Sequence, residues 1–246
     1  MAQHALRFNK VNKHFGQHPA LAEVDFSVEA GEFFALVGIN GAGKTTLLKC
    51  LLDFCATSGG KIEIFDVPHR ATRARSRLSF LPERFIPPFY LTGKDFLQYM
   101  LSLQGLAYES PRVEALLAAL DLDLAALTLP VRAYSKGMTQ KLGLAACFLS
   151  GKDLFVLDEP TSGLDPKARA RLKTKFRDLH AQSRTVFFTS HALADVEEMC
   201  DRMAVIHGGR ILFTGTPQAL CRQHTAANLE QAFLNCIGEP LAMTGT

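Results

Sequence analysis

Residues 38–46, GINGAGKTT, restrict the fold of this chain more than any other part of its sequence. They match the pattern G-x-x-x-x-G-K-[ST], in which the glycines let the backbone wrap so that its N–H groups point at phosphate oxygens. Residues 33–37, just before the pattern, are all apolar, as in a strand buried on both faces of a parallel sheet, and KTTLLKCLL is typical of a helix. A strand, this loop and a helix in succession predict an α/β fold with a phosphate-binding loop.

The loop also predicts roles for individual side chains. Lys44 is expected to reach the β- and γ-phosphates of a nucleotide, and the Thr45 hydroxyl is expected to ligate Mg²⁺. The positive end of the following helix adds to the attraction for phosphate. A chance match of a glycine-rich turn is the alternative, and the flanking strand and helix disfavour it. The predicted nucleotide-binding residues of the loop are Gly38, Asn40, Gly41, Ala42, Gly43, Lys44, Thr45 and Thr46.

A second motif, LFVLDEP at residues 154–160, is an apolar run that ends in two carboxylates. Ligands of open α/β sheets bind beyond the carboxyl ends of the strands, which is where these carboxylates are expected. Asp158 is predicted to hold Mg²⁺, directly or through water, and Glu159 to polarise a water that attacks the γ-phosphate. The two motifs predict a Mg²⁺-dependent NTPase. They leave kinase, GTPase and ATPase open, although no N-K-x-D run for guanine recognition follows the loop.

The rest of the chain alternates between strand-like and helix-like segments. MAVIHGGRILF predicts a hairpin that turns on Gly208 and Gly209. Helical patterns follow one another between Pro82 and the second motif, which predicts an α/β sheet domain carrying a helical insert. The other predicted strands are 61–65, 78–81, 154–157 and 185–189, and the predicted helices are 93–106, 111–122, 135–149 and 166–182.

Composition limits the partners and the compartment. The 246 residues are 48% hydrophobic and carry a net charge of only +3, which argues against a nucleic-acid partner. The basic run at 69–77 is predicted to be a solvated surface strip, with a phosphate-binding patch as the alternative. No segment approaches the about 18 apolar residues that a membrane span requires. Without a signal-peptide pattern or a CxxC pair, the chain is expected to be soluble, cytoplasmic and in a reducing compartment.

The segment YSKGMTQKLGLA, from residue 134 to 145, predicts a helix with an unusual beginning. Ser135 is a favourable N-cap, yet Lys136 and Gly137 occupy the first turn, where the glycine costs roughly 1 kcal/mol relative to alanine. The stretch contains no nucleophile, base or metal cage, so its role depends on the rest of the chain.

The order of these motifs makes the chain resemble the nucleotide-binding subunit of ATP-binding cassette (ABC) transporters. The resemblance runs from about Leu6 to about Gly238 and rests on 38–46, on YSKGM, on LFVLDEP, on SGLD at 162–165 and on the Ser190-His191 pair. It implies a P-loop NTPase mixed sheet with an N-terminal antiparallel β portion and an inserted helical subdomain. It also implies one domain over 1–246, with a catalytic core of 1–83 and 152–225, a helical subdomain of 84–151 and a short tail of 226–246.

The resemblance assigns further roles. Phe15 stacks on adenine, with core packing as the alternative, and His191 contacts the γ-phosphate. Two subunits face head to tail, so that Ser135, the Gly137 N–H and the positive end of their helix grip the partner's ATP. Asp165 communicates across that dimer and is also able to cap the next helix.

Three positions depart from the family's usual residues. Lys136 replaces a glycine, and it either adds charge toward the phosphate or points to solvent. Met138 replaces a glutamine. Glu83, in SFLPERF, replaces a glutamine that senses Mg²⁺ and the attacking water, and it is expected to complete the metal site with Thr45 and Asp158.

The implied function is that of an ATPase which pairs with a second copy of itself or a homologous subunit around two Mg-ATP. It drives an integral membrane permease, on which it sits peripherally at the inner face of the cell membrane. SKGM, LPE and the ending NLEQAFLNCIG resemble the exporter branch. Residues 84–99 are expected to receive the permease's cytosolic helix or, alternatively, to pack within the subdomain. A soluble cassette ATPase not coupled to transport and a nucleotide-gated binding module are the two alternative functions.

Overall fold

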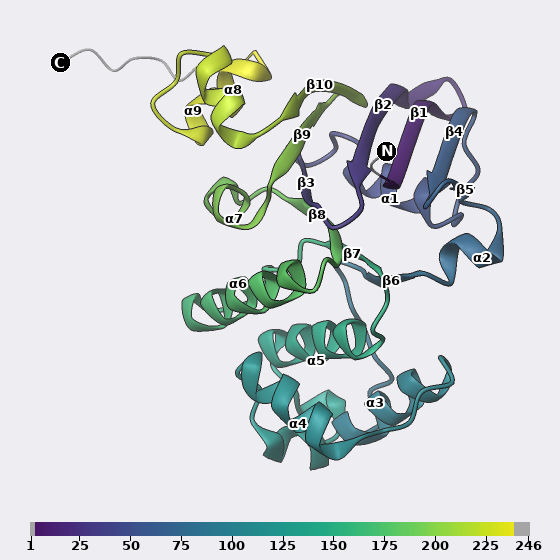
Figure 1. Ribbon diagram of the computed structural model, residues 1–246, viewed down its shortest axis with the longest axis vertical. Helices are drawn as coiled ribbons and strands as arrows, with labels where there is room; N and C mark the ends of the chain where they lie inside the picture. Colours follow the sequence, from purple (N-terminus) through teal and green to yellow (C-terminus); the bar gives the residue numbers. More distant parts are fainter. Residues whose placement is uncertain (1–2, 239–246) are drawn as a thin grey trace. The chain divides into compact units, whose positions relative to one another are not determined.

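The computed structural model describes residues 3–238, and the chain folds into two compact units (Figure 1). Within the described residues, one unit joins 3–77 to 185–238, and the other is Leu78–Arg184. The predicted boundaries between catalytic core and helical subdomain, at 83/84 and 151/152, differ from the boundaries of these two units. The division into core and subdomain therefore stays a prediction. Among the described residues, no helix combines the length and the apolar character that a membrane crossing needs.

The first unit contains an antiparallel sheet with the strand order β2-β1-β4-β5. Its strands are β1 (His4–Phe15), β2 (His18–Glu29), β4 (Gly59–Ile64) and β5 (Val67–Pro68). Alternate residues of β2 are buried, among them Val24, Phe26 and Val28, because period-two patterning directs one face of a strand to the core. The Phe26 ring stacks on Phe8 of β1 at 4.5 Å between centroids. The expected N-terminal antiparallel portion is confirmed.

A second group of strands in this unit has the order β10-β9-β3-β8. The central strand β3 (Phe33–Val37) pairs in parallel with both β8 (Thr185–Ser190) and β9 (Arg202–His207), and all of its residues are buried, as predicted from its unbroken apolar run. The strands β9 and β10 (Arg210–Gly215) pair antiparallel. They turn on Gly208 and Gly209, whose φ angles are 53° and 75°, so the predicted hairpin is confirmed.

Five short helices complete the described part of this unit. Helix α1 (Lys44–Leu51) follows the phosphate loop, α2 (Thr72–Arg75) lies in the basic run, and α7 (Leu193–Met199) follows β8. Near the C-terminus, α8 (Pro217–Gln223) and α9 (Leu229–Cys236), drawn in yellow in Figure 1, pack against each other, and α9 also packs against α7. Leu229 and Phe233 of α9 are buried, so the described part of the predicted tail at 226–246 contains a packed helix. Residues 239–246 of that predicted tail lie outside the described residues.

The second unit joins a pair of parallel strands to the helical insert. The strands are β6 (Leu78–Leu81) and β7 (Leu154–Asp158), and the helices are α3 (Gly93–Ser102), α4 (Ser110–Ala119), α5 (Lys136–Leu149) and α6 (Pro166–Ala181), with short 3-10 turns at Leu124–Thr128 and Val131–Ala133. Thr92 and Asp95 form a capping box that begins α3. Helix α3 ends at Ser102, earlier than predicted, because the chain turns at Gly105, where φ is 70°. The α/β class with a helical insert is confirmed.

Candidate nucleotide-binding site

The phosphate loop has the backbone geometry that its glycines predict. Gly41 and Gly43 adopt φ angles of 83° and 114°, which disfavour any side chain. A Cβ on Gly38 would collide with the backbone carbonyl of Ile206 in β9. The close approach to β9 at one end and the positive φ angles at two more positions restrict the backbone of the loop at three glycines.

Lys44 lies across this loop. The residue is buried, and its Nζ donates to the carbonyl oxygens of Gly38 at 2.5 Å and Ile39 at 3.2 Å. Helix α1 begins at Lys44, and no side chain of the described residues caps its first turn. The N–H groups of a helix's first turn have no partner within the helix and carry a partial positive charge. The cation and the uncapped helix end fit a polyphosphate.

The remaining predicted residues of the first unit lie at its surface. Phe15 ends β1 and is 53% exposed, with the Lys13 Nζ 4.7 Å from the ring centroid. The ring is therefore not core, and its exposed area is available for stacking. Thr45 is exposed in the first turn of α1, and His191 is exposed directly after β8.

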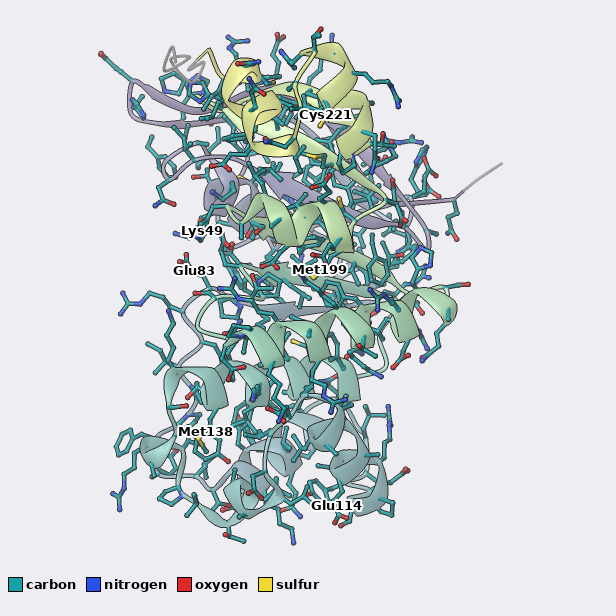
Figure 2. All side chains as sticks on the ribbon, turned by 90° about the vertical axis from the view of Figure 1, so that its left-hand side faces the viewer. Lys49, Glu83, Glu114, Met138, Met199 and Cys221 are labelled. Carbon is teal, nitrogen blue, oxygen red and sulfur yellow. The ribbon has the colours of Figure 1, made fainter. Side chains whose placement is uncertain are left out.

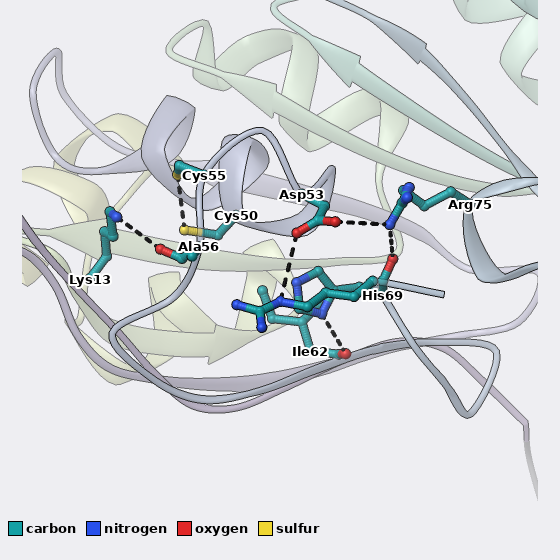
Figure 3. Close-up of polar contacts among 9 residues, drawn as sticks. Lys13, Cys50, Asp53, Cys55, Ala56, Ile62, His69 and Arg75 are labelled. Atoms are coloured by element: carbon teal, nitrogen blue, oxygen red, sulfur yellow. Dashed lines mark hydrogen bonds and ion pairs between the residues drawn. The ribbon is translucent and has the colours of Figure 1, made fainter. Parts of the chain in front are cut away.

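Arginines of the basic run are engaged within the chain beyond the end of α1 (Figure 3). Asp53 accepts from Arg75 at 3.3 Å and lies 3.7 Å from the Nε of Arg70. The Nδ1 of His69 donates to the Ile62 carbonyl at 3.0 Å, and burial lowers the pKa of His69, so the ring is neutral near pH 7. These internal contacts argue against 69–77 as a phosphate site, and because His69 and Ala74 are buried, the run is solvated only in part.

Two cysteines lie together at the end of α1. The Sγ atoms of Cys50 and Cys55 are 3.5 Å apart, and burial is the main cause that raises the pKa of Cys50 to about 12 (Figure 3). A thiol with so high a pKa is protonated at neutral pH and behaves as a small apolar group. Cys50 is accordingly a fully buried core residue.

In the second unit, β7 carries the two acidic residues to its carboxyl end. All five residues of β7 are buried, and Asp158 and Glu159 are each only 5% exposed. Glu159 has a φ of 51°, in a left-handed conformation that costs a non-glycine residue roughly 1–2 kcal/mol. The Ser162 N–H donates to the Glu159 carbonyl at 3.0 Å and closes the turn. Strain of this kind gathers at functional sites, and no feature of the sequence indicated it.

The acidic residues suit a hard cation. Carboxylates are costly to bury unless cations or donors face them, and carboxylate oxygens are preferred ligands of Mg²⁺. Within residues 3–238, no three acidic, histidine or cysteine side chains gather as a metal cage. A cation at Asp158 would therefore take further ligands from hydroxyls, phosphates and water. Glu83 is exposed in the loop after β6, and Thr45 belongs to the other unit.

The helix start at 134–138 is built as predicted. The Ser135 Oγ accepts from the Met138 N–H at 3.2 Å, and α5 begins at Lys136. Met138 is half-buried in the first turn of α5 (Figure 2). A Cβ on Gly137 would lie 3.0 Å from the carbonyl oxygen of Gly163, so the chain's own packing is a reason for the glycine that sequence analysis missed.

The segment after Glu159 meets this same helix. Gln140, which is buried in α5, donates from Nε2 to the Pro160 carbonyl at 3.1 Å. The Lys136 Nζ donates to the Ser162 Oγ at 3.3 Å, so the exposed Lys136 side chain also makes a contact within the chain. The Asp165 carboxylate accepts from the Ala168 N–H at 2.8 Å, which confirms Asp165 as the cap of α6.

Residues 84–99 divide into a packed part and an exposed part. Phe85 is half-buried and meets Phe96 edge to face, at 5.6 Å between ring centroids. Ile86, Phe89 and Tyr90 are 78%, 65% and 68% exposed. Phe85 therefore packs within the subdomain, while the reception of a permease helix by this segment stays a prediction.

Comparison with known proteins adds a family to this geometry. The sequence profile of the family described as ABC transporter matches residues 21–162. An uncharacterized ABC transporter ATP-binding protein of Synechocystis sp. is 40% identical over 201 residues, which are 80% of this chain and 56% of that protein. The chain thus spans less than two thirds of this relative's length.

Two further matches cover more of both chains. The Nod factor export ATP-binding protein I of Paraburkholderia xenovorans is 33% identical over 241 residues, which are 95% of this chain and 78% of that one. A solved structure described as an ATP binding subunit of an ABC transporter superposes with a TM-score of 0.87 at 28% identity, and the match covers 94% of this chain and 99% of that one.

Proposed function

This chain belongs to the ABC transporter family, and we propose that it is the subunit that binds and hydrolyses Mg-ATP and thereby drives a membrane permease. The observation that carries the proposal is the phosphate loop. Its positive-φ glycines, the buried Lys44 ammonium and the uncapped start of α1 form one anion-binding surface. Lys44 contributes a point charge at the β- and γ-phosphates, and the loop contributes backbone donors that are already in position.

The buried pair at the end of β7 supplies the acidic half of the chemistry. The proposed ligands of Mg²⁺ are Asp158, Thr45 and Glu83. When bound, the ion would neutralise part of the negative charge of the phosphates. Glu159 accepts a proton from, or orients, the water that attacks the γ-phosphorus. The strained backbone of Glu159 and the burial of its side chain support this role, because both restrict the positions that the carboxylate is able to adopt.

Two copies of the chain are proposed to enclose each nucleotide. The positive end of α5, with Ser135 and the Gly137 N–H, would face the γ-phosphate bound by the partner. Phe15 would stack on the adenine, and its half-exposed ring supports that role. His191 would contact the γ-phosphate within its own chain, and Asp165 would reach across the dimer while it caps α6.

The membrane partner is proposed to dock on the exposed part of 84–99. Ile86, Phe89 and Tyr90 offer apolar and aromatic area, which is the kind of surface that anchors protein interfaces. The chain would then sit peripherally on the inner face of the cell membrane. Export is the proposed direction, because several relatives carry the name Nod factor export ATP-binding protein I.

The test of the proposal is ATP turnover by the purified chain, with Glu159→Gln as the decisive variant. Loss of a positioned proton acceptor lowers turnover by about 100-fold or more. Glu114→Gln is the matched control, because Glu114 is an exposed carboxylate on α4 that is not part of the proposed site (Figure 2). Equal rates for the wild type and Glu159→Gln would refute the role of Glu159. Tight ATP binding without wild-type turnover would support a nucleotide-gated binding module instead.

A further inference from the structure

One face of α5 contacts the segment that follows Glu159. Lys136, Gly137 and Gln140 point to this face, since residues four apart on a helix lie above one another. They meet Ser162, Gly163 and Pro160, respectively, through the two hydrogen bonds and the close approach of Gly137 described above. The helix start and the turn after β7 are therefore in contact at three successive points.

Lys136 makes the outermost of these contacts with its whole side chain. A Cβ on Gly163 would lie 2.9 Å from the Cδ and Cε of Lys136 and 3.0 Å from its Cγ, so the methylenes cover that glycine. Gly163 has a φ of 75°, which also disfavours a side chain there. At the tip, the ammonium donates to Ser162. An apolar stem and a charged head thus act on two consecutive residues of the turn.

We infer that Lys136 is a positioning residue that fixes the Ser135 turn to the turn at 162–165. The inference rests on the proposed function. There, Ser135 serves the nucleotide of the partner, while the segment after Glu159 belongs to the chain's own nucleotide. A rigid link between the two turns makes the placement of one depend on the other, so the two nucleotide sites of a dimer are coupled through each chain.

The contact is suited to positioning rather than to folding. Lys136 is exposed, and an exposed charged contact contributes little to the free energy of unfolding. Variants at this position should therefore keep the fold, while the order of 162–165 and the rate of hydrolysis change. Lys136→Met keeps most of the stem and removes the charge, Lys136→Ala removes both, and Lys136→Arg restores a donor on a long stem.

The experiment measures amide hydrogen exchange in the nucleotide-free chain and, separately, kcat and KM for ATP. We expect faster exchange at 162–165 in Lys136→Ala, an intermediate effect in Lys136→Met, and wild-type exchange in Lys136→Arg. We expect kcat to fall about 3-fold in Lys136→Met and about 10-fold in Lys136→Ala, because the lost hydrogen bond leaves the turn at 162–165 misplaced in the reacting complex. We expect KM to change by less than about 2-fold, because the turn is not proposed to set the affinity for ATP. Lys61→Met, an exposed lysine on β4, is the control for loss of charge and should match the wild type.

Three results would overturn the inference. The first is unchanged exchange at 162–165 in Lys136→Ala, which would show that the contact does not order the turn. The second is faster exchange with unchanged kcat, and the third is an increase spread evenly over the whole chain. If the wild type itself fails to hydrolyse ATP, the proposed function fails, while the exchange measurement still decides whether Lys136 orders the turn.

Discussion

Replacing Gly137 by alanine tests whether this glycine is needed for the stability of α5 or for its proposed contact with the partner's nucleotide. The added Cβ would lie 3.0 Å from the Gly163 carbonyl oxygen, whereas favourable contacts of carbon lie at about 3.5–4.0 Å. The turn at Gly163 must therefore retreat by about 0.5 Å. Overpacking in a core costs about 1–3 kcal/mol, and because Gly163 is exposed rather than in the core, we place the cost at about 1 kcal/mol.

The helix gains in the same substitution. Alanine is favoured over glycine by up to about 1 kcal/mol in a helix, so gain and cost nearly cancel. We expect the free energy of unfolding of Gly137→Ala to stay within about 1 kcal/mol of the wild type, which corresponds to a change in Tm of no more than about 4 °C. ATP turnover should nevertheless fall about 10-fold or more, because the Gly137 N–H and the turn at 163 are both displaced.

Gly143, in the same helix, provides the contrast. A Cβ there would lie 2.6 Å from the Cδ1 of Leu81 and 2.8 Å from the Cδ1 of Phe85 in a packed interior. Gly143→Ala should therefore be destabilised by about 1–3 kcal/mol. Thermal unfolding and ATPase assays of the two variants test the reasoning. It would be refuted if Gly137→Ala lost as much stability as Gly143→Ala, or if Gly137→Ala turned over ATP at the wild-type rate.

Three further predictions follow from the same contacts. Gly38→Ala should abolish ATP binding, measured by equilibrium titration, because its Cβ collides with a backbone carbonyl of β9 that cannot move aside; binding at wild-type affinity would contradict this. A hydrogen bond from Lys167 is the main cause that lowers the pKa of Asp121 below its ordinary 3.8, so this stabilisation is present at neutral pH and is lost as the pH falls through the lowered value. Asp121→Asn should therefore show a smaller loss of stability between pH 7 and pH 3 in urea unfolding, and an unchanged loss would count against the ion pair. Tyr90→Ser should reduce copurification with the membrane permease while ATPase activity persists, and Leu212→Ser, an exposed apolar residue on β10, should leave copurification intact.

Features set by neighbouring residues could be predicted from the sequence. Four features depend on a few adjacent side chains or backbone angles, so a short stretch of sequence is enough to predict them. They are the phosphate loop, the buried strand β3, the hairpin at Gly208 and the cap at Ser135. Helix α9 was missed because it is short, with its cap at Asn228 and its buried pair at Leu229 and Phe233 spread over a single turn.

Features that depend on distant parts of the chain could not be predicted. The contact of Lys136 with Ser162 joins residues 26 positions apart, and the sequence left the lysine either facing a phosphate or pointing to solvent. The glycine at 137 was explained only by the space a phosphate requires, because nothing in YSKGM indicates Gly163 as a neighbour. The left-handed backbone at Glu159 is likewise a consequence of the turn it must close, and a glutamate gives no local signal for it.

The mass of the Glu159→Gln chain in solution, with and without Mg-ATP, tests the central claim that two copies enclose the nucleotide. This variant should bind ATP without consuming it, so a closed pair would persist during light scattering. One chain weighs 27.0 kDa, and the account predicts a mass twice that with ATP and a single chain without it. Adding Ser135→Trp, which blocks the turn proposed to face the partner's phosphate, should return the mass to one chain. A variant that stays at 27.0 kDa with saturating ATP, or that pairs equally well with Trp at 135, would contradict the account.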